Sequence, residues 1–205
     1  MTIGSLLVFE GLDGSGKSTQ LARLAQRLGA AGHQVVSTAE PYMGGGWGPR
    51  IREMARSGRP LAPPEELRWF LEQRREHVRD VIAPALAGGQ VVLSDRYFLS
   101  TAAYQGARGL DRDEILRASE AEFPVPDLVL LLDVHAEEGL GRISGRSGHA
   151  EPVFERREFQ ERVAAQFAAL DRPYIARIAG TADVDAVEVH VVAAVTDRTD
   201  LLQPG

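Results

Sequence analysis

A glycine-rich run near the N-terminus constrains the fold of this chain more than any other segment. Residues 11–18 read Gly-Leu-Asp-Gly-Ser-Gly-Lys-Ser and fit the pattern G-x-x-x-x-G-K-[ST]. An apolar run, residues 6–9, precedes the motif, and apolar residues at helical spacing follow it. The motif requires this context, because the N–H groups of the loop and the N-terminus of the helix bind phosphate together. The sequence therefore predicts a nucleotide phosphate site after the first strand.

The residues of this motif have separate predicted roles. We expect Lys17 to reach the β- and γ-phosphates and the Ser18 hydroxyl to bind Mg²⁺. The predicted ATP site comprises Gly11, Asp13, Gly14, Ser15, Gly16, Lys17, Ser18 and Thr19. A glycine-rich turn with a surface lysine is the alternative, which the flanking strand and helix disfavour. The motif leaves the acceptor open, because GTPases, ATPases and small-molecule kinases share it.

Strand and helix patterns alternate along the rest of the chain. Further strands are expected at residues 35–38, 91–93, 128–132 and, near the C-terminus, 183–186. Helices are expected at residues 17–31, 51–55, 65–86 and 155–177, followed by one that carries Val187, Val191 and Val195. Residues 201–205 read as a frayed tail. This alternation predicts a three-layer α/β fold of the P-loop NTPase type, with a five-stranded parallel sheet and helices on both faces.

Composition excludes several classes of protein. The 205 residues suit one compact domain over residues 1–205, and no apolar run approaches the roughly 20 residues that span a bilayer. A formal charge of −6 argues against a nucleic-acid partner, because such proteins normally present a basic surface. The sequence contains no cysteine, and we expect no export signal. We therefore expect a cytoplasmic protein with neither nucleic acid nor membrane as partner.

A second group of residues has the chemistry to bind an acceptor nucleotide. Phe70 and Arg74 are four residues apart on an expected helix, so both side chains leave one face. The ring can stack on a base while the guanidinium donates to a base carbonyl, although Phe70 also fits a core position. Arg96 follows an expected strand, at the edge where open α/β sheets bind ligands, and is expected to hold the acceptor phosphate.

The chain resembles the thymidylate kinase family over nearly its whole length. The resemblance is carried by residues 9–19, Glu40-Pro41, Ile51-Arg52, the pair Phe70 and Arg74, and the run 95–105, Asp-Arg-Tyr-Phe-Leu-Ser-Thr-Ala-Ala-Tyr-Gln. It implies transfer of the γ-phosphoryl group of ATP to dTMP by a homodimer, with Mg²⁺ as cofactor. A related P-loop kinase for another nucleoside or nucleoside monophosphate is the nearest alternative. A regulatory module that binds nucleotide without catalysis is a second.

The resemblance also assigns residues to the acceptor. It implies that dTMP contacts Asp13, Glu40, Pro41, Arg52, Phe70, Arg74, Arg96, Ser100, Thr101, Tyr104 and Gln105. In that set, Asp13 meets the 3′-hydroxyl, Tyr104 packs where a 2′-hydroxyl would lie, and two arginines, Arg52 and Arg96, hold the phosphate. Thr101 and Gln105 offer hydrogen bonds to the thymine edge, with Ser100 in support. Asp95 is implied as a Mg²⁺ residue beside Ser18, in preference to Asp133 after the next strand, and Glu40 is expected near the phosphate and Mg²⁺.

A glycine-rich basic segment, residues 141–149, has the composition of a mobile lid, expected over about residues 142–154. Phosphoryl transfer needs cations around the transferring group and the exclusion of water. The resemblance places a catalytic arginine either in the P-loop or in the lid. This P-loop has none, so Arg142 and Arg146 are expected to act with Lys17 and Arg96. An ordinary solvated loop is the alternative.

Residues 39–44 depart from the family pattern. Where R-E-P-G-G-T is common in the family, this chain reads Ala-Glu-Pro-Tyr-Met-Gly. An arginine expected beside the acceptor phosphate is therefore alanine. We hypothesise that Arg50, or an aromatic contact from Tyr42 or Trp47, compensates for it.

Overall fold

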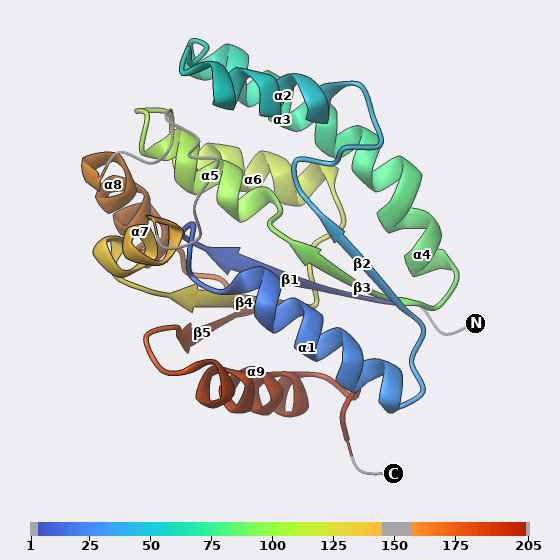
Figure 1. Ribbon diagram of the computed structural model, residues 1–205. Helices are drawn as coiled ribbons and strands as arrows, with labels where there is room; N and C mark the ends of the chain where they lie inside the picture. The colour runs from blue at the N-terminus through green and yellow to red at the C-terminus, as the bar shows by residue number, and fades with distance from the viewer. Residues whose placement is uncertain (1–3, 145–156, 204–205) are drawn as a thin grey trace.

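Five parallel strands form one sheet in the order β2-β3-β1-β4-β5 (Figure 1). The computed structural model describes residues 4–144 and 157–203. The strands are β1 (Ser5–Gly11), β2 (Val35–Ala39), β3 (Val91–Asp95), β4 (Leu128–Asp133) and β5 (Ile175–Ala179). With helices on both faces, this architecture confirms the three-layer α/β fold expected from the sequence.

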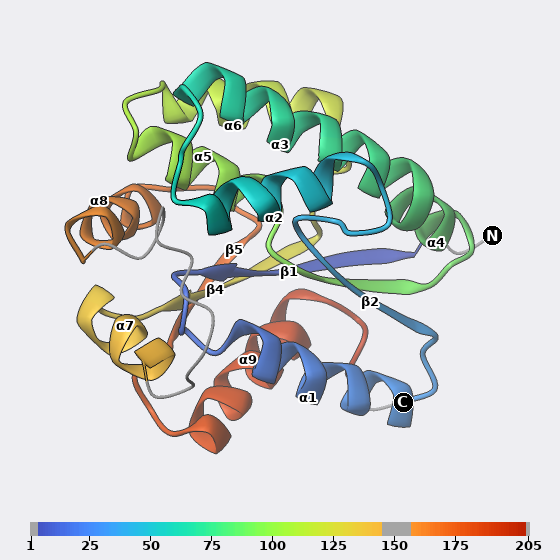
Figure 2. The ribbon, with the colours of Figure 1, turned by 45° about the horizontal axis from the view of Figure 1, so that its top comes forward.

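The helices divide between the two faces and one end of the sheet. One face carries α1 (Lys17–Ala30) and α9 (Val184–Arg198), which lie below the sheet in Figure 1. The opposite face carries α2 (Trp47–Ser57), α3 (Pro63–His77), the π-helical segment η1 (Val78–Ile82), α4 (Ala83–Ala87), α5 (Phe98–Gly106) and α6 (Arg112–Glu122) (Figure 2). The helices α7 (Ala136–Ser144) and α8 (Arg157–Ala168) lie at the end of the sheet toward which β1 points. Among the described residues, no helix has the length and apolarity to cross a bilayer.

Alternate residues of β1 belong to two separate apolar cores. Leu6 and Val8 pack with α5, α6 and α8, whereas Leu7 and Phe9 pack with α1 and α9. Each of these four side chains is at most 1% exposed. Successive side chains of a strand point to opposite faces, so a strand covered on both sides needs an uninterrupted apolar run. Residues 6–9 supply that run, which is why the sequence identifies this strand so clearly.

The register brings the carboxyl ends of the central strands together. Phe9 of β1 pairs with Asp95 of β3, and Gly11 of β1 pairs with Leu132 of β4. Segments that follow these strands therefore leave the sheet side by side. The glycine-rich loop after β1 and Arg96 after β3 are neighbours for this reason, at the edge where open α/β sheets bind ligands.

Three predictions near the C-terminus are wrong. The helix expected at residues 155–177 ends at Ala168 in the described part of the chain, and residues 175–179 are instead the edge strand β5 beside β4. Residues 183–186 are not a strand, because the Asp183 carboxylate accepts hydrogen bonds from the N–H groups of Asp185 and Ala186 and begins α9. The expected frayed tail packs through Leu201 and Leu202 against the core around α1 and α9.

Two helices differ in extent from the prediction. The helix expected at residues 65–86 spans 63–87 but passes through η1, where the N–H of Ala83 donates to the carbonyl of Val78. Pro84 has no N–H for a regular bond to the carbonyl one turn earlier, and a π-turn absorbs that irregularity. The short helix expected at residues 51–55 is α2, which begins at Trp47 and ends at Ser57.

Candidate active site

The glycine-rich loop encloses the Lys17 side chain. Its Nζ donates to the carbonyl oxygens of Gly11 (3.1 Å) and Leu12 (2.7 Å) and lies 3.5 Å from Ser15 Oγ. Burial, reinforced by the nearby charge of Arg96, lowers the pKa of Lys17 to about 8. Gly14 has a φ of 77°, in the left-handed region that other residues avoid. The loop thus holds a buried cation at the N-terminus of α1, the arrangement that binds phosphate.

Two oxygen-bearing side chains meet beside this loop. Ser18 Oγ, in the first turn of α1, donates to Asp95 Oδ2 at the end of β3 over 2.5 Å. A hydroxyl and a carboxylate match the preference of Mg²⁺, which commonly takes one or two protein ligands together with water and phosphate oxygens. No group of three or more metal-binding histidine, cysteine or acidic residues occurs in the described chain. The donor set therefore fits a metal shared with a nucleotide rather than one enclosed by protein.

Arg96 connects the glycine-rich loop to α5. Its Nη2 donates to Asp13 Oδ1 (2.5 Å), and its Nη1 donates to the Gly11 carbonyl (3.1 Å) and to Ser100 Oγ (2.8 Å). Tyr104, one turn beyond Ser100, donates its hydroxyl to Asp13 Oδ2 (3.2 Å). Although burial opposes it, the charges of Arg96 and Lys17 hold the pKa of Asp13 below its usual value. Residues predicted from two distant motifs thus form one connected group.

Arg74 lies at the centre of a second buried group. Its side chain is 0% exposed, and its Nη2 donates to Glu40 Oε2 (2.5 Å) and Thr101 Oγ1 (2.8 Å). The Arg74 Cζ lies 5.1 Å from the centroid of the Tyr97 ring. Arg74 Nη1 is buried and has no hydrogen-bond partner within the described residues. Most buried donors are paired, so this group has the capacity to bind a ligand oxygen.

His77 belongs to the same group and was not predicted from the sequence. Its Nδ1 lies 3.2 Å from Glu40 Oε1, and its Nε2 lies 2.7 Å from Thr38 Oγ1. Its ring stacks on Tyr42 with centroids 5.0 Å apart. Burial opposes ionisation of Glu40, but Arg74 and His77 hold the pKa of that carboxyl below its usual value. Its spacing could have indicated this role, because His77 follows Arg74 by three residues and so lies on the same face of α3.

The remaining predicted acceptor residues lie around these two groups. Phe70 is half-buried on α3, one turn before Arg74, and Arg52 is half-buried on α2. Pro41 follows Glu40 and is partly buried. Gln105 is fully buried and donates its amide to Glu66 Oε1 (2.7 Å), while its Oε1 has no partner in the described chain. Glu66, which also pairs with Arg108, was missed by the sequence interpretation.

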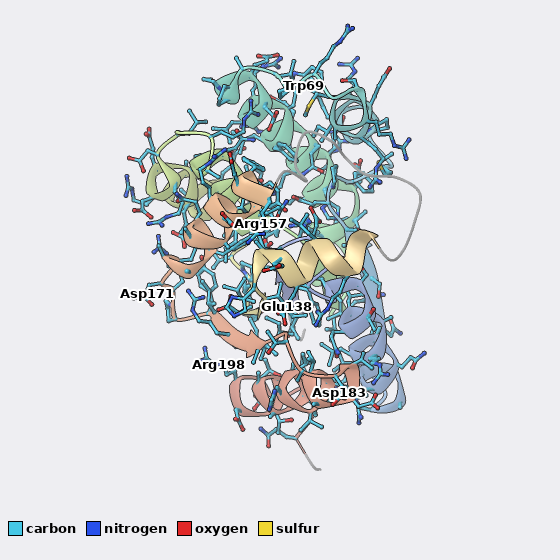
Figure 3. All side chains as sticks on the ribbon, turned by 60° about the vertical axis from the view of Figure 1, so that its left-hand side comes forward. Trp69, Glu138, Arg157, Asp171, Asp183 and Arg198 are labelled. Atoms are coloured by element: carbon cyan, nitrogen blue, oxygen red, sulfur yellow. The ribbon has the colours of Figure 1, made fainter. Side chains whose placement is uncertain are left out.

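The predicted lid begins within a helix rather than a loop. Arg142 lies in the last turn of α7, where its Nη1 donates to the carbonyl oxygens of Gly180 (3.1 Å) and Gly14 (3.4 Å). A Cβ built on Gly139 would lie 2.5 Å from the Asp13 carbonyl oxygen, so α7 packs directly on the phosphate loop. Figure 3 views this end of the molecule, with α7 in front and Glu138 labelled on it. Arg146 and residues 145–154 of the predicted lid lie outside the described residues.

Comparison with known proteins decides which P-loop family this geometry represents. A family model described as "Thymidylate kinase" matches residues 9–189. The chain belongs to the thymidylate kinase family. Among similar proteins, a thymidylate kinase of Desulfotalea psychrophila is 43% identical over 94% of this chain and 94% of its own length. Thymidylate kinases of Xanthomonas euvesicatoria and Xanthomonas campestris are 46% and 47% identical, each over 95% of this chain and 86% of the relative.

Membership of the thymidylate kinase family makes this chain a kinase, a phosphotransferase with the ATP-binding loop described above. The segment that departs from the family pattern packs against α3. Tyr42 stacks on His77, its N–H donates to Gln73 Oε1 (2.8 Å), and the Arg50 Cζ lies 4.9 Å from the Trp47 ring centroid. Glu40 pairs with Arg74, and its expected place near the phosphate stays a prediction. Compensation for the missing arginine by Arg50, Tyr42 or Trp47 stays a prediction.

Proposed function

We propose that this chain is a thymidylate kinase that transfers the γ-phosphoryl group of ATP to dTMP, giving dTDP and ADP. Its family and the identity of 43% to 47% to thymidylate kinases support the reaction. The observation that carries the proposal is the connection from Asp13 through Arg96 to Ser100 and Tyr104. It joins the loop that holds the donor phosphates to the helix that bears the acceptor motif.

The acceptor nucleotide is proposed to lie between this connected group and α3. Asp13 and Tyr104 would contact the sugar, and the charge of the Arg96 guanidinium, held by Gly11, Ser100 and Asp13, would attract the phosphate. Arg74 Nη1, which lacks a partner among the described residues, would donate to a thymine carbonyl, and Phe70 would stack on the base. Thr101 already accepts from Arg74, so it orients the guanidinium as well as lining the site.

The proposed chemistry needs no general base, because the phosphate of dTMP is already an anionic nucleophile. Lys17, Arg96 and Arg142 are proposed to surround the transferring group, where cations stabilise charge on a loose transition state. Arg142 approaches the phosphate loop from α7, and Arg146 is proposed to join it. Ser18 and Asp95 would hold Mg²⁺. When bound, that ion would neutralise charge on the donor phosphates.

Three further proposals rest on the sequence and the resemblance. We propose one catalytic domain over residues 1–205, a homodimer and a cytoplasmic location. Size-exclusion chromatography with light scattering at several protein concentrations tests the homodimer, and a monomer at every concentration would contradict it.

Coupled measurement of ADP release with a panel of acceptors tests the function. We expect strong stimulation by dTMP and much weaker stimulation by dUMP, dCMP and AMP. Preference for another acceptor would favour a related nucleoside monophosphate kinase, and ATP binding without acceptor-dependent ADP release would favour a regulatory module. Lys17→Ala should lose turnover, and Arg74→Ala should raise KM for dTMP more than KM for ATP.

A further inference from the structure

A buried carboxylate in β1 takes part in neither predicted substrate site. Glu10 is 0% exposed, and its Oε1 accepts hydrogen bonds from the N–H groups of Tyr97 (2.9 Å) and Ser100 (3.0 Å). Its Oε2 accepts from the Ser100 hydroxyl. A buried carboxylate is costly, and three donors aimed at it indicate a built site. All three donors belong to the turn and helix that follow Arg96.

Glu10 replaces the local cap of α5. Tyr97 is the N-cap residue of this helix and provides no side-chain hydrogen bond to it. Glu10 accepts hydrogen bonds from the N–H groups of the N-cap residue, Tyr97, and of the third helical residue, Ser100. In a capping box, side chains of the helix itself accept from these two N–H groups. The charge also lies at the end of the helix where the dipole favours an anion. The strand therefore fixes the start of the acceptor helix.

Ser100 transmits this constraint to Arg96. The Ser100 hydroxyl has one proton, which it donates to Glu10, so its lone pairs are free to accept from Arg96 Nη1 (2.8 Å). Arg96 has a φ of 73°, and it is the only residue other than glycine with a positive φ among the described residues. Such a conformation persists only where its surroundings hold it.

We propose that Glu10 is a positioning residue, whose ionised carboxylate orients the Ser100 hydroxyl and the start of α5 so that Arg96 points toward the acceptor phosphate. The inference rests on the proposed function, because it assigns the Arg96 guanidinium to the phosphate of dTMP.

Protonation of Glu10 would reverse one of these hydrogen bonds. Burial, although opposed by the Ser100 hydrogen bond and the charge of Arg96, raises the pKa of Glu10 to about 7. The charged groups that act on it are Arg96 after β3 and Lys17 on α1. A protonated carboxyl would donate to Ser100 Oγ, so the Ser100 proton would turn away from Glu10 and Arg96 would lose the attraction of a nearby negative charge. Acceptor binding should therefore weaken as the pH falls through about 7.

Glu10→Gln is the direct test, because it keeps the shape and one acceptor oxygen while replacing the charge by an amide donor. We expect KM for dTMP to rise about tenfold or more, as for loss of a charge-assisted hydrogen bond, with KM for ATP within about twofold of wild type. In wild type, kcat/KM for dTMP should fall below about pH 7. In Glu10→Gln, only the titration of the dTMP phosphate, near pH 6, should remain.

Two further variants keep the proposal testable if Glu10→Gln does not fold. Ser100→Ala removes the intervening hydroxyl and should also raise KM for dTMP selectively, and the double variant should be no weaker than the worse single variant, because the residues act in series. Glu120→Gln is the matched control, since Glu120 is a partly buried carboxylate of α6 that pairs with Arg172 and contacts neither predicted substrate site. It should change neither KM.

The outcomes separate the inference from the proposed function. Absence of dTMP-dependent ADP release in wild type would overturn the function itself. An active wild type with KM for dTMP unchanged in both Glu10→Gln and Ser100→Ala would overturn the positioning role alone. Equal increases in KM for ATP and dTMP would also overturn it, because they would indicate general damage to the phosphate loop.

Discussion

His77 shows how the acceptor side depends on buried hydrogen bonds at the scale of single residues. His77→Phe would keep the ring stack on Tyr42 while removing both ring-nitrogen contacts, to Glu40 and to Thr38. Glu40 would keep its bonds to Arg74, but Thr38 Oγ1 would lose the contact to His77 Nε2. We expect a loss of about 1–3 kcal/mol in the free energy of unfolding, measured by urea denaturation.

A second substitution separates the lost hydrogen bonds from changes in ring packing. Adding Thr38→Val to His77→Phe removes the Thr38 hydroxyl that has lost its partner. Apolar replacement of both hydrogen-bond partners often changes stability little. The double variant should therefore recover part of the loss. A His77→Phe variant within about 0.5 kcal/mol of wild type would mean that these contacts contribute little.

Residues in a motif with a fixed spacing could be predicted, and residues paired across the chain could not. Lys17 and Ser18 follow from the glycine-rich pattern, and Arg96 follows from its place after a strand. Glu10 lies inside the recognised run, yet its partners Tyr97 and Ser100 are about ninety positions away. No local pattern indicates that pairing, because the sheet register creates it.

At the scale of elements, the contact between α7 and the phosphate loop inverts the usual effect of a glycine substitution. Alanine commonly stabilises the interior of a helix relative to glycine by roughly 0.5–1 kcal/mol. A Cβ on Gly139 would lie 2.5 Å from the Asp13 carbonyl oxygen, so Gly139→Ala must move α7 or the loop. We expect a loss of about 1–3 kcal/mol in stability and a raised KM for ATP, measured by thermal melts and steady-state kinetics.

Gly141 in the same helix provides the matched control, because a Cβ there would meet no atom of another described element within 4 Å. Gly141→Ala should leave KM for ATP unchanged and should keep or raise the Tm. If the two alanine variants behaved alike, close packing of α7 on the loop would not be what holds the nucleotide site together.

Elements were predictable where their apolar pattern was unambiguous. The strand β4 reads as a continuous apolar run, as does β1. The sequence of β5 resembles the end of a helix, because it mixes arginine and alanine with isoleucine. The α5 helix was not predicted as an element, since its N-cap is supplied by Glu10 of β1 rather than by its own sequence.

At the scale of the whole molecule, the buried Glu10 should make stability depend on pH in an unusual direction. Most buried carboxylates with cationic partners have a lowered pKa and lose stability in acid, but burial raises the pKa of Glu10 from 4.5 to about 7. The folded state therefore binds this proton more tightly than the unfolded state. The Glu10 contribution to stability is full below about pH 4.5 and is lost as the pH rises through about 7.

Glu10→Gln isolates this contribution from every other titrating group. The difference between 4.5 and about 7 corresponds to about 3 kcal/mol at 1.36 kcal/mol per pH unit, as an upper limit. Relative to the glutamine variant, wild type should lose up to that amount of unfolding free energy between about pH 4 and pH 8, measured by urea denaturation at each pH. The variant should thus gain stability relative to wild type as the pH rises while binding dTMP more weakly, a conflict between stability and activity expected of a carboxylate retained for positioning. Parallel pH curves for the two proteins would instead mean that Glu10 stays ionised throughout and acts only as a helix cap.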